Sequence, residues 1–255
     1  MKNNKVYIVL IAILILFAVL MYFMVGKEKI EKRKQAVTIL TGEKTVFEYS
    51  NNKWSSNNNI KKYDWKKFSI FLDNEYKGEY YVWNDDRWLI FDDNKEAVNY
   101  TENFLGISAN INVNLIPFNT LENSDLNYAS QVLRGHDISP NADLTVNTVT
   151  NVDIDGDGIE ESIYIISNAF PIDFEPAMTF SYIFMVKEDQ IYMIYQFEDD
   201  NNLDNGLKPY ISSILDVDND GIYELLITYA RYSTQEPINA LYKFENNQFK
   251  NLVSG

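Results

Sequence analysis

Two short acidic segments hold the residues whose types and spacing are best suited to chemistry. Each segment places carboxylates at the first, third, fifth and ninth positions of a loop, with a glycine at the sixth. The carboxylates of the first segment, VDIDGDGIEE, are Asp153, Asp155, Asp157 and Glu161. Those of the second segment, LDVDNDGIYE, are Asp216, Asp218, Asp220 and Glu224.

The spacing predicts that each set of carboxylates converges on one point. Gly158 and Gly221 allow the sharp turn, and the residues that follow them, Ile159 and Ile222, can offer backbone carbonyls as ligands. At an effective dielectric constant of about 20, two carboxylates ~4 Å apart repel by roughly 4 kcal/mol, and a bound cation reverses that cost. All-oxygen ligation suits Ca²⁺, so the sequence predicts two Ca²⁺ sites that pin their loops. Acidic Asp-Gly turns without a metal are the alternative.

The repeated segment differs from an EF-hand, because Tyr164 and Ile227 stand where a glutamate is required at the twelfth position. With the closing acid at the ninth position, it resembles the calcium loops of FG-GAP and VCBS-type repeats, which are the units of integrin-α-like β-propellers. The resemblance covers residues 145–255 and implies calcium ligation and hairpins like propeller blades. The FG and GAP signatures are absent and two units cannot close a seven-bladed ring, so a closed propeller is not expected.

The remaining pattern predicts a mainly β protein. Aromatic-rich runs at Lys77–Trp83 and Arg87–Asp92 flank a turn-forming cluster at residues 84–86 and predict a hairpin. Residues 180–195 and 239–253 predict a further hairpin after each acidic segment. Region 60–144 is therefore expected to be mostly β, and region 145–255 to hold the two calcium-loop repeats.

One short helix is expected near residues 125–133. Ser124 can cap its N-terminus, and Gly135 can end it. Leu126, Ala129 and Leu133 recur at helical spacing and predict one apolar face.

The N-terminal region predicts a membrane anchor. Residues 6–25 carry no charge and, as a helix, would span about 30 Å, the thickness of a bilayer core. They follow a short tail at 1–5, expected in the cytoplasm, and precede a charged stalk and polar linker at 26–59. One short strand is expected in the linker, around Thr45–Tyr49. The basic tail and the calcium prediction place the C-terminal domain outside the cell, although five cations after the apolar run favour the opposite orientation.

Composition restricts the possible partners. The 255-residue chain has a formal net charge of -15, no Cys and one His. This excludes disulfides, thiolate zinc sites and multi-histidine metal sites, and it argues against nucleic acid as a partner. The expected partners are the lipid bilayer, through residues 6–25, and a protein or polysaccharide of unknown identity.

These features favour a non-catalytic surface module that binds a partner or has a structural role. His136 follows the predicted helix, where a polar residue is more common than a catalytic base. Two alternatives stay open. One is a membrane-anchored hydrolase of cell-wall polymers with catalytic acids in region 60–144, and the other is an accessory subunit of a membrane complex. A pocket that joins two carboxylates would favour the hydrolase.

Overall fold

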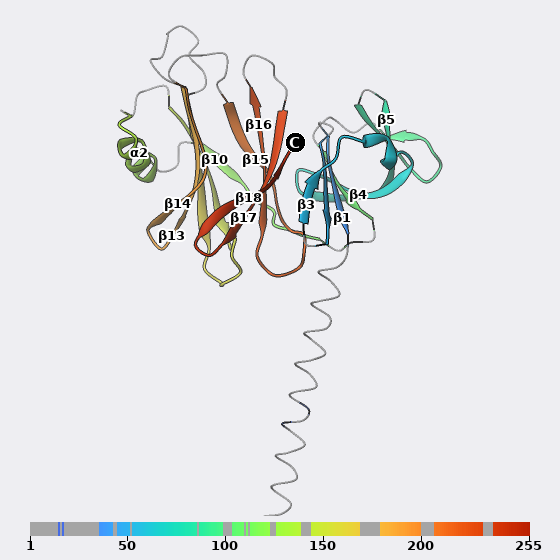
Figure 1. Ribbon diagram of the computed structural model, residues 1–255, viewed down its shortest axis with the longest axis horizontal. Coiled ribbons are helices and arrows are strands. Elements are labelled where there is room, and N and C mark those ends of the chain that lie inside the picture. The colour runs from blue at the N-terminus through green and yellow to red at the C-terminus, as the bar shows by residue number, and fades with distance from the viewer. Residues whose placement is uncertain are drawn as a thin grey trace, which may run out of the picture.

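The computed structural model describes residues 15, 17, 36–42, 45–51, 53–85, 87–98, 104–109, 111, 113–122, 126–138, 144–168, 179–199, 207–231 and 237–255. These residues form three antiparallel sheets and the helix α2 (Leu126–Gly135) (Figure 1). The prediction of a mainly β chain is confirmed, and the sheets are open rather than closed into a ring.

The first sheet is built from the N-terminal part of the chain. It has eight strands, in the order β3 (Lys53–Ser56), β2 (Val46–Ser50), β1 (Val37–Thr41), β8 (Phe104–Ser108), β4 (Lys66–Leu72), β5 (Glu75–Asp85), β6 (Arg87–Phe91) and β7 (Ala97–Val98). A short 3-10 helix at Ile60–Tyr63 joins β3 to β4. The predicted hairpin is present, since β5 pairs with β6 from Tyr81–Phe91 to Asp85–Arg87.

The C-terminal part repeats one unit twice. The first repeat is a meander of β11 (Thr145–Val152), β12 (Glu161–Ser167), β13 (Thr179–Lys187) and β14 (Gln190–Asp199). The second is a meander of β15 (Leu207–Asp216), β16 (Glu224–Arg231), β17 (Pro237–Glu245) and β18 (Gln248–Ser254). Each meander gains one short edge strand from the segment before the repeats, because β10 (Thr120–Glu122) pairs with β11 and β9 (Asn114–Leu115) pairs with β15. The acidic segments connect the first two strands of each repeat.

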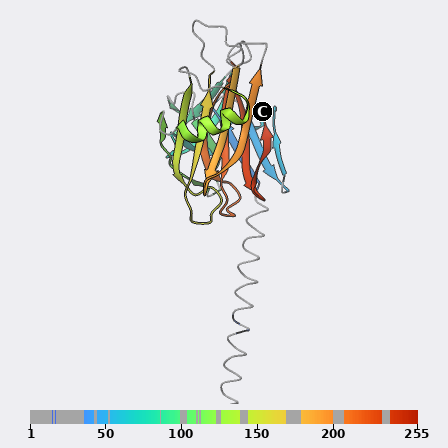
Figure 2. The ribbon, with the colours of Figure 1, turned by 90° about the vertical axis from the view of Figure 1, so that its left-hand side faces the viewer.

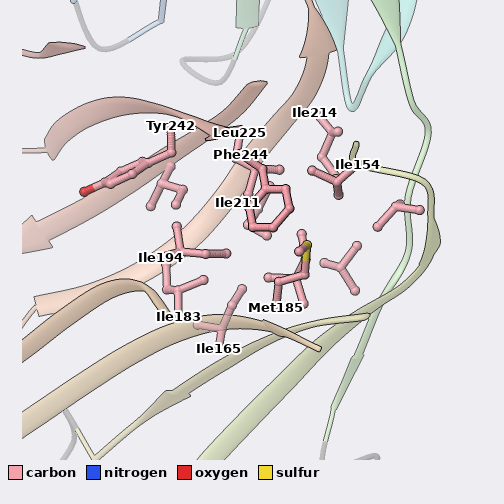
Figure 3. Close-up of a cluster of buried hydrophobic side chains, with 14 of the residues drawn as sticks. Ile154, Ile165, Ile183, Met185, Ile194, Ile211, Ile214, Leu225, Tyr242 and Phe244 are labelled. Atoms are coloured by element: carbon pink, nitrogen blue, oxygen red, sulfur yellow. The ribbon is translucent and has the colours of Figure 1, made fainter. Parts of the chain in front are cut away.

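The main hydrophobic core lies between the two repeats. Side chains from both meanders interdigitate there, among them Ile165 and Ile183 of the first repeat and Ile211 and Leu225 of the second (Figure 3). Ile154, which lies inside the first acidic loop, is fully buried in the same core. The loop is therefore tied to the core by one of its own residues.

The outer faces of the two repeats are also covered. Helix α2 lies across the first repeat (Figure 2). Its residue Leu133 is buried in a cluster that also contains Tyr164 and Tyr182. The N-terminal sheet packs on the second repeat through a cluster that joins Ile39 and Leu226. Because the central strands of both repeats are buried on two faces, they are apolar runs such as ESIYIIS rather than strictly alternating strands.

Two features of the fold differ from the sequence expectation. Residues 37–41, 46–50 and 53–56, expected to be part of a stalk and linker with one short strand around 45–49, form the three strands β1, β2 and β3. Val37 and Ile39 are buried, so the β domain begins well before residue 60. In α2, Leu126 is exposed, and Val132 joins Ala129 and Leu133 on the buried face instead.

Other predictions concern residues outside the described part of the chain. Apart from Ile15 and Phe17, this applies to the proposed membrane segment at 6–25, and it applies to the helix cap at Ser124. Among the described residues, no helix has the length and apolar character needed to cross a bilayer.

Candidate metal centres

The first aspartate of each acidic segment organises its loop. The carboxylate of Asp153 accepts hydrogen bonds from the backbone N–H groups of Gly156, Asp157 and Gly158, at 2.8, 3.2 and 3.0 Å. Asp216 accepts two equivalent bonds, from the N–H groups of Asp220 and Gly221, both at 3.1 Å. These bonds curl the backbone around the carboxylate, because charged acceptors form strong hydrogen bonds with backbone amides.

The turn also requires left-handed backbone at two positions of each loop. Gly158 and Gly221, at the sixth position, both have φ of 87°. At the fourth position, Gly156 has φ of 73° and Asn219 has φ of 54°. Glycine and asparagine adopt this region at the lowest cost. The two loops therefore share one backbone form, as their common spacing predicts.

The closing glutamates are buried beneath the loops. Glu161 Oε2 accepts a hydrogen bond from the N–H of Ile154 at 2.7 Å, and Glu224 Oε2 accepts one from Val217 at 2.9 Å. The two residues are each only 1% exposed. Through this hydrogen bond, the Oε2 atom of each glutamate holds the backbone of its loop. The other oxygen, Oε1, is left to face the acidic cluster.

The structure gathers seven of the eight predicted carboxylates into two clusters. In the first, one oxygen from each of Asp153, Asp155, Asp157 and Glu161 lies within 4.8 Å of the others. The second cluster contains Asp216, Asp218 and Asp220 but not Glu224. Ile159 and Ile222 donate their N–H groups to Asp157 and Asp220, at 2.8 and 2.9 Å. Ligation through their carbonyls stays a prediction.

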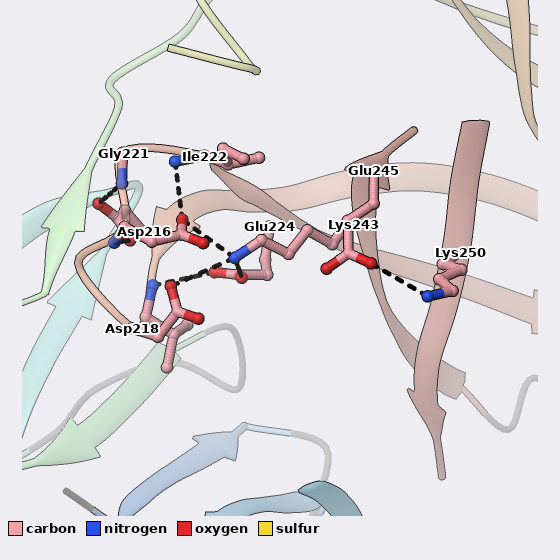
Figure 4. A network of polar contacts seen from close by, with 10 residues as sticks. Asp216, Asp218, Gly221, Ile222, Glu224, Lys243, Glu245 and Lys250 are labelled. Carbon is pink, nitrogen blue, oxygen red and sulfur yellow. Dashed lines mark hydrogen bonds and ion pairs between the residues drawn. The ribbon is translucent and has the colours of Figure 1, made fainter. Parts of the chain in front are cut away.

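Each cluster is contacted by a lysine that the sequence reasoning missed. Lys243 Nζ lies 2.6 Å from Glu224 Oε1, 3.2 Å from Asp218 Oδ1 and 3.1 Å from Asp220 Oδ1 (Figure 4). In the first cluster, Lys187 Nζ donates to Asp155 and Asp157 and is 3.5 Å from Glu161 Oε1. An ammonium group therefore offsets part of the repulsion between the carboxylates in both loops.

The two lysines occupy equivalent places in the repeats. Lys243 on β17 pairs directly with Glu224 on β16, and Lys187 lies one position beyond the Ser162–Val186 pair of β12 and β13. Their separations along the sequence from the closing glutamates differ, because the β12–β13 connection is longer than the β16–β17 connection. One local signal was present in the sequence, since Lys243 interrupts the apolar run NALYKF and is only 4% exposed.

The two clusters differ in whether their buried carboxylate oxygens have hydrogen-bond partners. In the second, Lys243 reaches the bottom of the loop and bonds Glu224 Oε1. In the first, Glu161 Oε1 and Asp155 Oδ1 are buried without a hydrogen-bond partner. A buried polar atom without a partner is costly, so each such atom in a folded protein calls for an explanation.

Electrostatics follow the same division. Burial raises the pKa of Glu224 to about 7, even though Lys243 opposes the shift. Burial alone would lower the pKa of Lys243, but the charges of Glu224 and its neighbouring aspartates outweigh it and raise that pKa. In the first loop, burial also raises the pKa of Glu161, whereas the hydrogen bond from Lys187 lowers the pKa of the exposed Asp157.

The two loops lie against each other. The N–H of Tyr223, in the second loop, donates to the carbonyl of Ile154, in the first, at 2.8 Å. A Cβ on Gly156 would meet the carbonyl oxygen of Gly221 at 2.2 Å, so the contact admits only glycine there. Burial raises the pKa of Tyr223, with further contributions from Asp216 and Asp153, one aspartate from each loop.

His136 lies just after the end of α2 and contacts residues of the first repeat. Its Nδ1 lies 2.9 Å from Glu198 Oε1, and its ring packs on Tyr182 with centroids 4.9 Å apart. Tyr182 also donates to Glu198, at 2.6 Å. These contacts fasten the helix to the first repeat.

We compared the chain with known proteins and found no match. No protein-family model, curated protein or solved structure matches the chain.

Proposed function

We propose that this chain is a membrane-anchored, extracellular β domain that acts as a non-catalytic binding or structural module, and that its first acidic loop binds Ca²⁺. The observation that carries the metal proposal is the pair of buried, unbonded oxygens at Asp155 and Glu161. They belong to the cluster of four carboxylates whose oxygens lie within 4.8 Å of one another.

The chemistry of the first loop favours a hard divalent cation. Four carboxylates face one ammonium group, so the cluster keeps a large negative charge. Lys187 reaches the two outer carboxylates but stays 3.5 Å from Glu161 Oε1. A Ca²⁺ ion takes six to eight oxygen ligands at about 2.3–2.6 Å and can satisfy the inner oxygens as well. The exposed rim at residues 156–160 leaves a path for the ion to enter.

The second loop supports a different state. Lys243 already bonds Glu224 and two aspartates, and its side chain is 5% exposed. We propose that this ammonium group takes the place of the second Ca²⁺ ion that the sequence predicts. The resemblance to FG-GAP and VCBS-type repeats stays part of the proposal, and the two four-stranded meanders support it.

The cell-surface location rests on the sequence of the first 34 residues. An uncharged run at 6–25 with a short basic tail is typical of an uncleaved signal anchor. Loops of this kind in extracellular modules bind Ca²⁺ with dissociation constants of about 10⁻⁴–10⁻³ M, which external calcium can fill. Protease treatment of intact cells tests this orientation, because an external domain is cleaved before the cells are permeabilised and an internal one only afterwards.

The hydrolase alternative has less support. A glycosidase requires two carboxyl groups that flank the scissile bond. One cavity among the described residues, between the N-terminal sheet and the second repeat, has a single carboxylate in its described lining, that of Asp73.

Thermal melting of the full-length chain in detergent, with Ca²⁺ or with chelator, tests the metal proposal. Wild type should melt at a higher temperature in millimolar Ca²⁺, and Asp155→Asn should abolish the difference. Asp218→Asn, the matched change in the second loop, should lower stability in both buffers but keep the response to Ca²⁺. An unresponsive wild type would contradict the proposal, as would loss of the response in Asp218→Asn alone.

A further inference from the structure

A cavity of about 320 Å³ lies between the N-terminal sheet and the second repeat, and it takes no part in the acidic loops. Its walls come from β1, β4 and β8 on one side and from β15, β16 and β17 on the other. The exposed residues Asp73 and Tyr210 are part of the lining, so the cavity reaches the surface. Its size falls at the lower end of the roughly 300–1,000 Å³ typical of small-molecule sites.

A buried network of uncharged polar groups lines part of the cavity. Asn239, only 1% exposed, accepts a hydrogen bond from Thr228 Oγ1 at 2.6 Å and donates to Thr41 Oγ1 at 3.3 Å. Thr228 also contacts Ser212 Oγ. Because Thr228 gives its proton to Asn239, Ser212 must be the donor in that second contact. The Ser212 oxygen can therefore accept a hydrogen bond from a ligand.

The local backbone brings Ser212 to this position. The pairing of β15 with β16 shifts register between Ile211 and Ser213, so Ser212 is the extra residue of a β-bulge. Bulges redirect a side chain and are common beside functional sites. Next to it, the Ser213 hydroxyl is shared between two acceptors, Asn74 Oδ1 at 2.9 Å and the carbonyl of Ser212 at 2.7 Å, and so joins β15 to the turn between β4 and β5. This bond links the two walls, which favours a cavity formed before any ligand arrives.

Aromatic side chains supply the apolar part of the lining. Phe71 and Phe104 come from the N-terminal sheet, Phe118 from the segment between β9 and β10, and Tyr210 from β15. Tyr76 extends this surface outside the cavity, since its ring lies 5.5 Å from that of Phe71. The cavity thus combines flat apolar surfaces with hydroxyl and amide groups.

The lining restricts the class of ligand. The described lining residues include no Lys, Arg or His, and Asp73 is acidic, so the described part of the lining disfavours an anionic ligand. A wholly apolar ligand would displace water from the Ser212 oxygen without offering it a hydrogen-bond donor, which is unfavourable. A sugar ring has an apolar C–H face that packs on aromatic rings and hydroxyl groups that both donate and accept hydrogen bonds. We propose that this cavity binds a neutral saccharide unit.

The test uses the full-length chain in a detergent without a sugar headgroup. Cellobiose, maltose and di-N-acetylchitobiose serve as neutral probes, with glucuronate as the charged, anionic probe, and binding is followed by ligand-observed NMR. At least one neutral disaccharide should bind saturably, equally well in Ca²⁺ and in chelator. Glucuronate should bind more weakly, because its carboxylate is repelled by Asp73.

Three variants locate the binding. Phe118→Ala should weaken it about tenfold, the effect of losing one packed aromatic ring. Ser212→Met should abolish binding by filling the cavity. It provides a second test in case Phe118→Ala loses packing and does not fold. Trp65→Ala removes an exposed ring outside the cavity and should change nothing. The proposal is overturned if no neutral probe binds, if a charged probe binds more tightly, or if folded Phe118→Ala and Ser212→Met bind as wild type does.

Discussion

The two acidic loops share a sequence pattern and a backbone form, yet they satisfy their buried charge differently. In the second loop, Lys243 lies deep in the structure and bonds the closing glutamate. In the first, Lys187 stays with the outer aspartates and leaves Glu161 Oε1 unbonded. A repeated motif therefore does not guarantee a repeated site, because a side chain from a neighbouring strand can supply the charge that the motif needs.

Exposure separates the loops in the same way. Residues 156–160 of the first loop are exposed, whereas most of the second loop is partly buried. Tyr223, at the eighth position of the second loop, contacts the first loop, and Glu160 at the matching position is exposed. The first loop is accessible to an ion from solution, and the second loop is suited to a permanent internal cation, the ammonium group of Lys243.

The largest expected effect is that of Lys243→Met. Removal of one partner from a buried ion pair costs about 3–5 kcal/mol, because the other charge stays buried without compensation. Denaturant unfolding in chelator should show a loss of that size. Because the second loop would then lack a cation, the variant should also gain a second Ca²⁺ site. A loss below about 1 kcal/mol, the range of exposed ion pairs, would mean that Lys243 does not neutralise the loop.

The contact between the loops can be broken at Gly156. A Cβ there would lie 2.2 Å from the carbonyl oxygen of Gly221 at a left-handed φ, so Gly156→Ala should destabilise the fold by about 2–4 kcal/mol. Asn219→Gly, the matched control in the second loop, should change stability little, because glycine adopts the same φ freely. Both can be measured by urea unfolding. Equal stability of the two variants would argue against the contact.

A smaller effect should depend on pH. In the folded chain the pKa of Glu224 is raised to about 7, above its ordinary value of 4.5. Between these values the folded chain binds more protons than the unfolded chain, so stability falls as the pH rises from about 4.5 to 7, by at most ~3 kcal/mol. Glu224→Gln should flatten this slope in chelator. An unchanged slope would show that Glu224 does not titrate in that window.

The smallest expected effect is that of Lys187→Met. Its partner Asp157 is exposed, but Lys187 also bonds the partly buried Asp155, so the loss in chelator should be about 1–2 kcal/mol, between the values of exposed and buried ion pairs. Because the lysine no longer competes, Ca²⁺ should bind more tightly than in wild type, which calorimetric titration can measure. Weaker Ca²⁺ binding would show that Lys187 assists the ion rather than competes with it.

Local patterns predicted the parts of the fold that depend on near neighbours. The hairpin of β5 and β6, the helix α2 and the two hairpins after the acidic loops follow from runs of apolar residues and turn signals. Strand β2 matches the short strand expected around residues 45–49, but β3 was not predicted, because Asn and Ser surround it in the sequence. Trp54 shows why β3 forms, since it packs on Tyr49 with ring centroids 5.1 Å apart and joins the core between the N-terminal sheet and the second repeat.

In the candidate site, too, local contacts could be predicted from the sequence and contacts between strands could not. Carboxylates within nine residues of one another converge because the loop itself brings them together, and their spacing predicted this. Lys187 and Lys243 arrive from another strand, at a separation that depends on the length of the intervening connection. Sequence spacing carries no information on such a contact until the pairing of the strands is known.

The number of Ca²⁺ ions that the full-length chain binds tests the contrast between the loops most directly. Equilibrium dialysis at millimolar Ca²⁺ should give one ion per wild-type chain and none for Asp155→Asn. Two ions per wild-type chain would show that Lys243 does not replace the metal in the second loop, and none would show that the first loop is not a metal site.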